Sequence, residues 1–230
     1  MNHLEAEPPS AKICYMRKVS FGEGEFYHIY NRGVDKRRVF LDKEDFERFL
    51  QSMEEFNTLD PIGSIYENYF LKKSQPGGRT SKRGSLVNFV AYCVNPNHYH
   101  FILKQVRKNG VEKFMQRLGT GYTMYFNNKY KRNGVLFQGS FKAVHINSNK
   151  HLLHLSAYVN LNNKVHKLRD QTSKSSWEEY AKGREELCVK KLVLDQFNNF
   201  SEYKNFAEES LKDILERKEL RKELENSLFE

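Results

Sequence analysis

The sequence has little cysteine and no long apolar run. Its three cysteines, Cys14, Cys93 and Cys188, are widely spaced in 230 residues and form neither a disulfide framework nor a zinc pattern. No segment approaches the ~20 apolar residues that a membrane helix requires. Residues 1–18 lack the apolar core of a signal peptide. The composition therefore predicts a cytoplasmic protein with no membrane partner, in which residues 1–20 form a flexible leader.

Acidic residues are scarce in the middle of the chain. Residues 104–150 contain ten Lys or Arg and one acid, whereas residues 201–230 carry nine acids and six bases. Aromatic residues interrupt the basic segment at Tyr122, Tyr125, Phe126, Tyr130, Phe137 and Phe141. Cations neutralise phosphates and aromatic rings stack on unpaired bases, so the segment suits single-stranded nucleic acid. A solvated basic face over ordinary core aromatics explains the pattern equally well.

Hydrophobic periodicity and turn residues predict the order strand, helix, strand, strand, helix, strand, helix. Strands are expected at residues 26–30, 86–94, 98–105 and 135–146, and a helix at residues 111–127. Two further helices are expected to begin at the N-caps Asp42 and Asn149. This order matches the ferredoxin-like split βαβ fold, an α+β class with an antiparallel sheet and helices on one face.

The regions around this core predict the domain organisation. Residues 21–170 are expected to form the catalytic domain, with an insertion at about 59–85 that holds a polar, Gly-rich loop. That loop is either a mobile DNA contact or a solvated insertion. Residues 171–230 are expected to form a mostly helical C-terminal extension, with helices at 188–200 and 202–228.

His98 and His100 stand two residues apart in a predicted strand, so their side chains point to the same face and Tyr99 to the other. Two neutral imidazoles on one face can hold a divalent cation and leave positions open for a phosphate oxygen. An isolated pair of this kind is often only a polar strand end. The preceding Asn-Pro-Asn turn and the basic segment that follows favour a metal site.

Thirteen tyrosines compete for the role of nucleophile. On a helix, Tyr158 and Asn162 are i and i+4 neighbours, so Asn162 could add an amide oxygen to a metal beside the phenol. From spacing alone, an amphipathic tyrosine at a helix–sheet interface is the favoured interpretation of Tyr158. Tyr122 and Tyr125 lie nearer to the histidines in sequence and are interpreted as packing or base-contacting residues.

The assembled motifs resemble the REP-associated tyrosine transposases, within the IS200-like single-tyrosine HUH transposase superfamily. The resemblance covers roughly residues 26–180 and depends on the order of the motifs more than on any one of them. They are YHIYNRG at 27–33, YCVNPNHYH at 92–100, YFN at 125–127, GVLFQGSFK at 134–142, YVNLN at 158–162 and SSWEEY at 175–180. In two places the chain departs from the family, because Asn163 stands where Pro is usual and Ser140 where Arg is frequent.

The resemblance implies an HUH endonuclease fold in which His98 and His100 bind Mg²⁺ or Mn²⁺ and Tyr158 is the nucleophile. It implies that Asn162 lies near or on the metal. The expected activity is that of a DNA transposase that cleaves and rejoins single-stranded or hairpin DNA through a 5′-phosphotyrosine. The protein would act as a monomer or a homodimer.

Three further residues, Lys142, Arg132 and Gln138, are candidates for positioning the DNA. Two other functions remain open. One is an HUH nicking enzyme of the replication-initiator or relaxase type, although the chain has no helicase motif. The other is a domesticated nucleic-acid-binding module without catalysis.

Overall fold

The computed structural model describes residues 19–67, 84–168, 172–183 and 187–227. Residues 1–18 of the predicted leader and most of the Gly-rich loop therefore lie outside the described residues. The elements, in chain order, are β1 (Phe26–Arg32), η1 (Val34–Lys36), α1 (Lys43–Glu55), β2 (Val87–Asn95), β3 (His98–Gln105), α3 (Gly110–Lys129), β4 (Lys142–Ile146), α4 (Asn149–Asn160), α5 (Asn162–Val165), β5 (Lys174–Ser175), α6 (Trp177–Lys182), α7 (Lys191–Leu194) and α8 (Phe200–Ser227).

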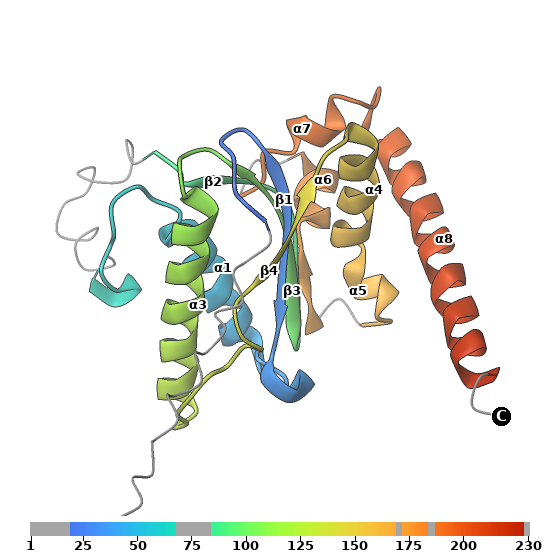
Figure 1. The fold of residues 1–230 in the computed structure, drawn as a ribbon. Helices are drawn as coiled ribbons and strands as arrows, with labels where there is room; N and C mark the ends of the chain where they lie inside the picture. The colour runs from blue at the N-terminus through green and yellow to red at the C-terminus, as the bar shows by residue number, and fades with distance from the viewer. Residues whose placement is uncertain (1–18, 68–83, 169–171, 184–186, 228–230) are drawn as a thin grey trace, which may run out of the picture.

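The centre of the molecule is a five-stranded sheet in the order β4-β1-β3-β2-β5, with every neighbouring pair antiparallel (Figure 1). The first four strands and the helices between them follow the predicted order, and the α+β class is confirmed. The two-residue strand β5 was not predicted. It comes from the segment beyond residue 170 and extends the sheet next to β2.

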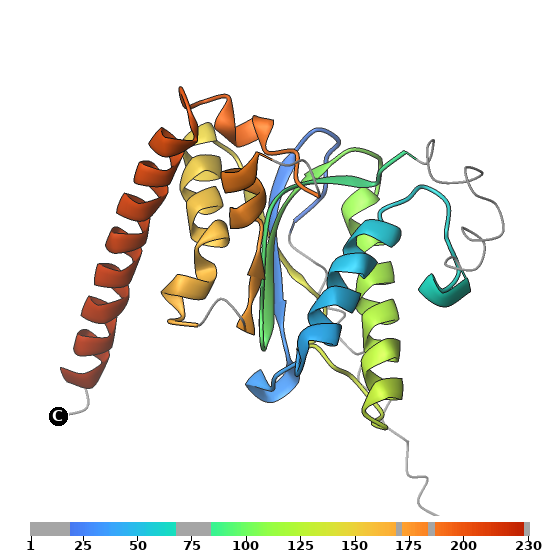
Figure 2. The ribbon, with the colours of Figure 1, turned by 180° about the vertical axis from the view of Figure 1, so that it is seen from behind.

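Helices cover both faces of this sheet. As expected, α1 and α3 lie on one face, but α4 and α6 lie on the other, with α8 outside α4 (Figures 1 and 2). The expectation of helices on one face therefore holds for α1 and α3 only. The reason lies in the middle of β3, where the consecutive residues Phe101, Ile102 and Leu103 are all fully buried. Neighbouring strand residues point to opposite faces, so both faces must be covered.

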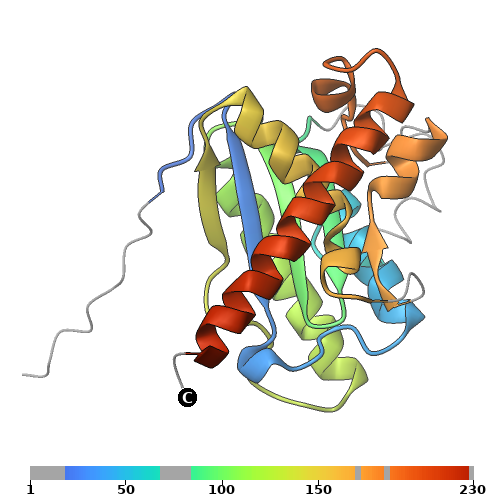
Figure 3. The same cartoon turned by 90° about the vertical axis from the view of Figure 1, so that its right-hand side faces the viewer.

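Helix α8 packs on α4 and crosses this second layer obliquely (Figure 3). Its anchor is Tyr203, a fully buried tyrosine whose hydroxyl lies 3.1 Å from Ser156 Oγ and accepts a hydrogen bond from Asn160 Nδ2 at 2.9 Å. The C-terminal helix therefore supports α4 from behind. Within the described part of the chain, no helix is both long and apolar enough to cross a membrane.

Several predicted boundaries are wrong in detail. The strand expected at 135–146 begins only at Lys142, because Gly134 and Gly139 adopt positive φ angles of 86° and 66° that interrupt an extended strand. The N-cap of α4 is Ser148, whose side chain accepts a hydrogen bond from the backbone N–H of His151, and not Asn149. Asp42 caps α1 as predicted, by accepting from the N–H of Asp45. The helix expected at 188–200 is reduced to α7.

Candidate active site

Strands β1 and β3 define the face on which the candidate site lies. Tyr30 pairs with His100, and Arg32 pairs with His98. Directly paired residues point to the same side of a sheet. His98 and His100 therefore share the face that α4 covers, with their rings 5.3 Å apart, whereas Tyr99 is buried on the α3 side.

The imidazole of His98 is held from both ends. Its Nδ1 lies 2.6 Å from Asn97 Oδ1, and the amide of Asn97 donates its own N–H to the carbonyl of Lys36. Asn97 Oδ1 is thus an acceptor, so Nδ1 of His98 carries the proton. The lone pair of Nε2 then faces Asn162 Oδ1 at 3.1 Å, and Asn95 Nδ2 lies 2.9 Å from the same Nε2.

Asn162 contributes an amide oxygen to this cluster from the helical side of the site. The side chain is fully buried, its Oδ1 accepts from Asn95 Nδ2 at 2.7 Å, and its Nδ2 has no hydrogen-bond partner among the described residues. Two electron-rich atoms, His98 Nε2 and Asn162 Oδ1, thus face one another. The Asn95 amide nitrogen lies within hydrogen-bonding distance of both atoms, and together the two atoms offer a nitrogen and an oxygen ligand to a divalent cation.

Tyr158 approaches the histidines from α4. Its ring meets His100 edge-on at 5.5 Å and His28 at 6.4 Å between ring centroids. Burial raises the pKa of the Tyr158 phenol, and the neighbouring Asn162 amide opposes that rise. The phenol therefore carries its proton at neutral pH and lies beside the cluster in the same chain.

The link between Tyr158 and Asn162 differs from the predicted one. The two residues do not share a continuous helix, because α4 ends at Asn160 and Leu161 has φ −107° and ψ 16° before α5 begins at Asn162. The Asn162 amide nevertheless lies close enough to the phenol to lower its pKa. Asn163, at the position where proline is usual in the family, lies buried in α5.

Burial keeps the three histidines neutral. It lowers the pKa of His98, and it lowers the pKa of His100 well below its usual value, helped by the charges of His28 and His98. Burial lowers the pKa of His28 to about 4, with a smaller contribution from the charge of His151. Only an unprotonated imidazole can bind a metal, so the histidines are in the binding form at neutral pH.

These side chains fit a divalent ion bound by few protein ligands. Within the described residues, no group of three or more His, Cys, Asp or Glu side chains is arranged to hold a metal. The available set is instead two imidazoles and one amide oxygen, beside a phenol. Such a mixed set of nitrogen and oxygen donors can take a divalent cation and leave coordination positions for substrate oxygens.

The candidate DNA-positioning residues lie in different surroundings. Lys142 is exposed on β4 and pairs with Tyr30, so it shares the face of the histidines. Gln138 accepts a hydrogen bond from Arg32 Nε, next to His98. Arg132 instead donates to Asn127 Oδ1 at 2.7 Å and to the Val135 carbonyl at 3.0 Å, in the turn after α3. The structure thus brings two of the three towards the site, and their role in binding DNA stays a prediction.

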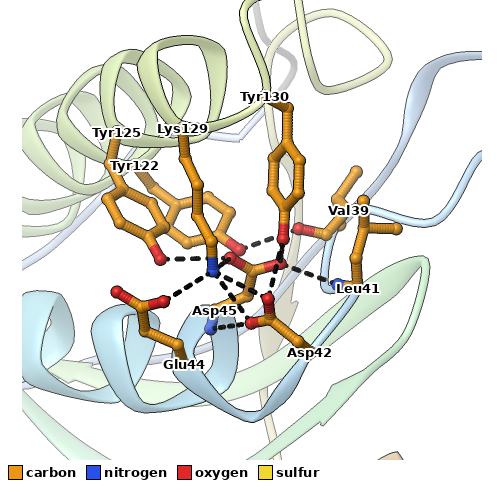
Figure 4. Close-up of polar contacts among 9 residues, drawn as sticks. All are labelled: Val39, Leu41, Asp42, Glu44, Asp45, Tyr122, Tyr125, Lys129 and Tyr130. Atoms are coloured by element: carbon orange, nitrogen blue, oxygen red, sulfur yellow. Dashed lines mark hydrogen bonds and ion pairs between the residues drawn. The ribbon is translucent and has the colours of Figure 1, made fainter.

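The competing tyrosines lie on the other side of the sheet, at the interface of α1 and α3 (Figure 4). The hydroxyl of Tyr122 donates to the Val39 carbonyl at 2.8 Å, and that of Tyr125 to Asp45 at 3.1 Å. Burial raises the pKa of Tyr125 to about 12. Lys129 joins the cluster by an ion pair with Asp45 at 3.0 Å. Both tyrosines are therefore packing residues in a closed polar cluster.

Interpretation of the sequence missed His28, Arg32 and Asn95, which surround the two histidines. A signal was present, because His28, Tyr30 and Arg32 alternate with buried residues along β1. Alternation shows that they share a face. It does not show that β1 lies beside β3 in this register, which depends on contacts between residues far apart in sequence.

Two histidines on one face of an antiparallel sheet, with a tyrosine and an amide from the helices that cover this face, define a class of site suited to phosphodiester chemistry. Comparison with known families agrees: residues 79–162, a little more than a third of the chain, match the family described as Transposase IS200 like. The match includes His98, His100, Tyr158 and Asn162, and it confirms the resemblance to IS200-like transposases.

One solved structure is also similar, that of a REP-associated tyrosine transposase bound to a REP hairpin. It is 13% identical to this chain, with a TM-score of 0.45, and the match covers 74% of this chain and 87% of that one. No curated protein matches the chain.

Proposed function

We propose that the protein is a metal-dependent transposase that cleaves and rejoins single-stranded DNA, in hairpin form as in the family it resembles. The observation that carries this proposal is the position of Tyr158, whose ring lies 5.5 Å from that of His100 on the same sheet face. A nucleophile beside a pair of neutral imidazoles that can hold a metal ion is an arrangement suited to attack on a phosphodiester.

In the proposed reaction the phenol oxygen of Tyr158 attacks the scissile phosphorus. One P–O bond forms and the bond to the 3′-oxygen breaks, which leaves a 5′-phosphotyrosine and a free 3′-hydroxyl. The proton lost by the phenol is balanced by the one that the 3′-oxygen gains. A hydroxyl can reverse the step and rejoin the strand, because an ester bond is exchanged for another of the same kind.

The other residues of the site have supporting roles. His98, His100 and Asn162 would hold Mg²⁺ or Mn²⁺, which when bound supplies Lewis acidity at the scissile phosphate. The Asn162 amide, which lowers the pKa of the phenol, would favour its ionisation during attack. Lys142 on β4 and Arg32 on β1, the two strands on one side of β3, would attract DNA phosphates.

The same site could serve an HUH nicking enzyme of the relaxase or initiator type, and the two enzymes differ in what happens to the cleaved strand. A transposase joins the phosphotyrosine end to a different DNA end. A binding module without catalysis would form no covalent product.

The test is incubation of the protein with a labelled hairpin that has single-stranded flanks, with Mn²⁺ or with EDTA, followed by a denaturing gel. We expect a shifted protein–DNA band with Mn²⁺ only, which disappears in Tyr158→Phe and persists in the matched variant Tyr125→Phe. Adding a second, unlabelled DNA end should yield a joined strand. Binding without any shifted band under these conditions would contradict the enzymatic proposal and support the binding module.

A further inference from the structure

His28, which has no role in the proposed reaction, forms a hydrogen bond with the ring of His100. Its Nε2 lies 2.9 Å from Nδ1 of His100, and the two rings are inclined by 21° with centroids 5.1 Å apart. That separation is about the largest that two imidazoles can have at this nitrogen–nitrogen distance. The rings therefore lie end to end, and the bond runs close to both ring planes, along the lone pair of the acceptor.

The contact has geometric support on both sides. His28 and His100 are diagonal neighbours on adjacent strands, because Tyr30 pairs with His100 two residues further along β1. The ring of Tyr30 lies 5.0 Å from that of His28 and 5.6 Å from that of His100. The edge of Tyr158 closes the cluster from α4. The orientation of His28 is thus fixed by packing as well as by the bond.

Only one proton can lie between these two nitrogens. If His28 donates it, His100 carries its own proton on Nε2, and that nitrogen cannot bind a metal. If His100 donates from Nδ1, its Nε2 keeps a free lone pair. The same logic applies to His98, whose Nδ1 donates to Asn97 and whose Nε2 faces Asn162. An outer partner that holds Nδ1 is what fixes the tautomer of a metal-binding imidazole.

We propose that His28 is a positioning residue that accepts the Nδ1 proton of His100 and so holds Nε2 of His100 ready for the metal. This role rests on the proposed function, because it presumes that His100 binds the ion. In this role His28 acts through His100 and is not itself a ligand of the ion.

The first test reads the tautomer in protein freed of metal with EDTA, at pH 7. Long-range ¹⁵N–¹H correlation spectra of the histidine rings distinguish a proton on Nδ1 from one on Nε2. We expect His100 to carry its proton on Nδ1 in the wild type. We expect a mixture of both tautomers in His28→Leu, and recovery of the Nδ1 form in His28→Gln, whose amide oxygen can accept the same proton. A wild-type His100 protonated on Nε2 would overturn the proposal, as would an unchanged spectrum in His28→Leu.

The second test measures Mn²⁺ affinity by calorimetry in the absence of DNA. Loss of an outer partner lowers metal affinity by roughly 10- to 100-fold, and we expect a loss of that size in His28→Leu and a much smaller one in His28→Gln. The control is His145→Leu, a strand histidine paired with Tyr27 and bonded to Glu25. Its affinity should equal that of the wild type. Equal loss in the Leu and Gln variants would overturn the positioning role.

These readouts separate the two proposals. A wild type that binds Mn²⁺ and shows the expected tautomer, yet forms no covalent DNA product, contradicts the proposed function and leaves the role of His28 intact. A wild type that forms the product while His28→Leu binds Mn²⁺ as tightly overturns the role of His28 alone.

Discussion

Nε2 of His98 and Oδ1 of Asn162 face each other at 3.1 Å, although both atoms are hydrogen-bond acceptors in the arrangement that their neighbours impose. His98 comes from β3 and Asn162 from the start of α5. The meeting of these two atoms brings the histidine pair and the tyrosine helix into a single site. Asn162 is fully buried there, and its Nδ2 lacks a partner among the described residues.

Removal of the Asn162 amide should weaken metal binding. We expect Asn162→Ala to lower Mn²⁺ affinity by roughly 10- to 100-fold, because one oxygen donor and the restraint on His98 are lost together. Calorimetric titration measures the change. Asn149→Ala, at the exposed start of α4, is the matched control and should bind as the wild type does. Equal affinity in the two variants would show that Asn162 holds no metal.

The catalytic groups should act within one chain, because Tyr158 lies next to His100 of the same molecule. We expect that a mixture of His100→Ala and Tyr158→Phe forms no covalent DNA product. A mixture of either variant with wild type should form as much product as the wild-type protein in it would form alone. The measurement is the shifted band on a denaturing gel after prolonged mixing. Restored activity in the mixture of the two variants would show instead that subunits exchange the tyrosine helix.

The cluster between α1 and α3 should contribute strongly to stability. Asp45 is fully buried and accepts hydrogen bonds from Lys129, Tyr125, Tyr130 and the Leu41 backbone (Figure 4). Its removal leaves these donors unpaired, so we expect Asp45→Ala to lower the free energy of unfolding by about 3 kcal/mol.

Two neighbouring variants calibrate that value. Asp42→Ala removes an N-cap and should cost about 1 kcal/mol. Lys43→Ala removes an exposed i,i+4 ion pair with Glu47 and should cost less than about 0.5 kcal/mol. Urea denaturation followed by circular dichroism gives all three values. A loss in Asp45→Ala as small as that in Lys43→Ala would contradict the importance of the buried carboxylate.

His28 should make stability depend on pH in the acidic range. Its pKa is lowered from 6.5 to about 4 in the folded protein. Between these two pH values, His28 is protonated in the unfolded chain and neutral in the folded chain. Stability that is present above pH 6.5 is therefore lost as the pH falls towards 4, at no more than about 1.4 kcal/mol per pH unit.

His28→Gln cannot take up this proton, and it should lose less stability than the wild type over the same range. Urea denaturation at pH 7, 5.5 and 4.5 provides the comparison, and carboxylates that titrate in both proteins cancel in the difference. Parallel stability curves for wild type and variant would show that His28 is not held neutral by the fold.

The order of elements followed from local signals, and so did the shared face of His98 and His100. Hydrophobic alternation identifies strands, and Asp42 is a local cap that the sequence reveals by itself. The other residues of the site could not be predicted from the sequence in the same way. That His28 meets His100 depends on the pairing of β1 with β3, and that Asn95 bonds Asn162 depends on the packing of α5 against β2.

Two local patterns predict the wrong backbone conformation. The apolar residues at 135–141 indicated a strand, but Leu136 and Phe137 are buried in a loop whose glycines break the extended conformation. The i+4 spacing indicated one continuous helix through Tyr158 and Asn162, whereas two helices meet at Leu161. In both cases packing, which one segment cannot show, decided the backbone.

The most direct test of the central claim is to find the residue that becomes attached to DNA. The covalent product formed with Mn²⁺ and a labelled hairpin is digested with protease and nuclease, and the modified peptide is sequenced by mass spectrometry. We predict a single modified peptide in which the nucleotide is bound to the Tyr158 phenol oxygen. Attachment to Tyr122, Tyr125 or any other residue would contradict the account.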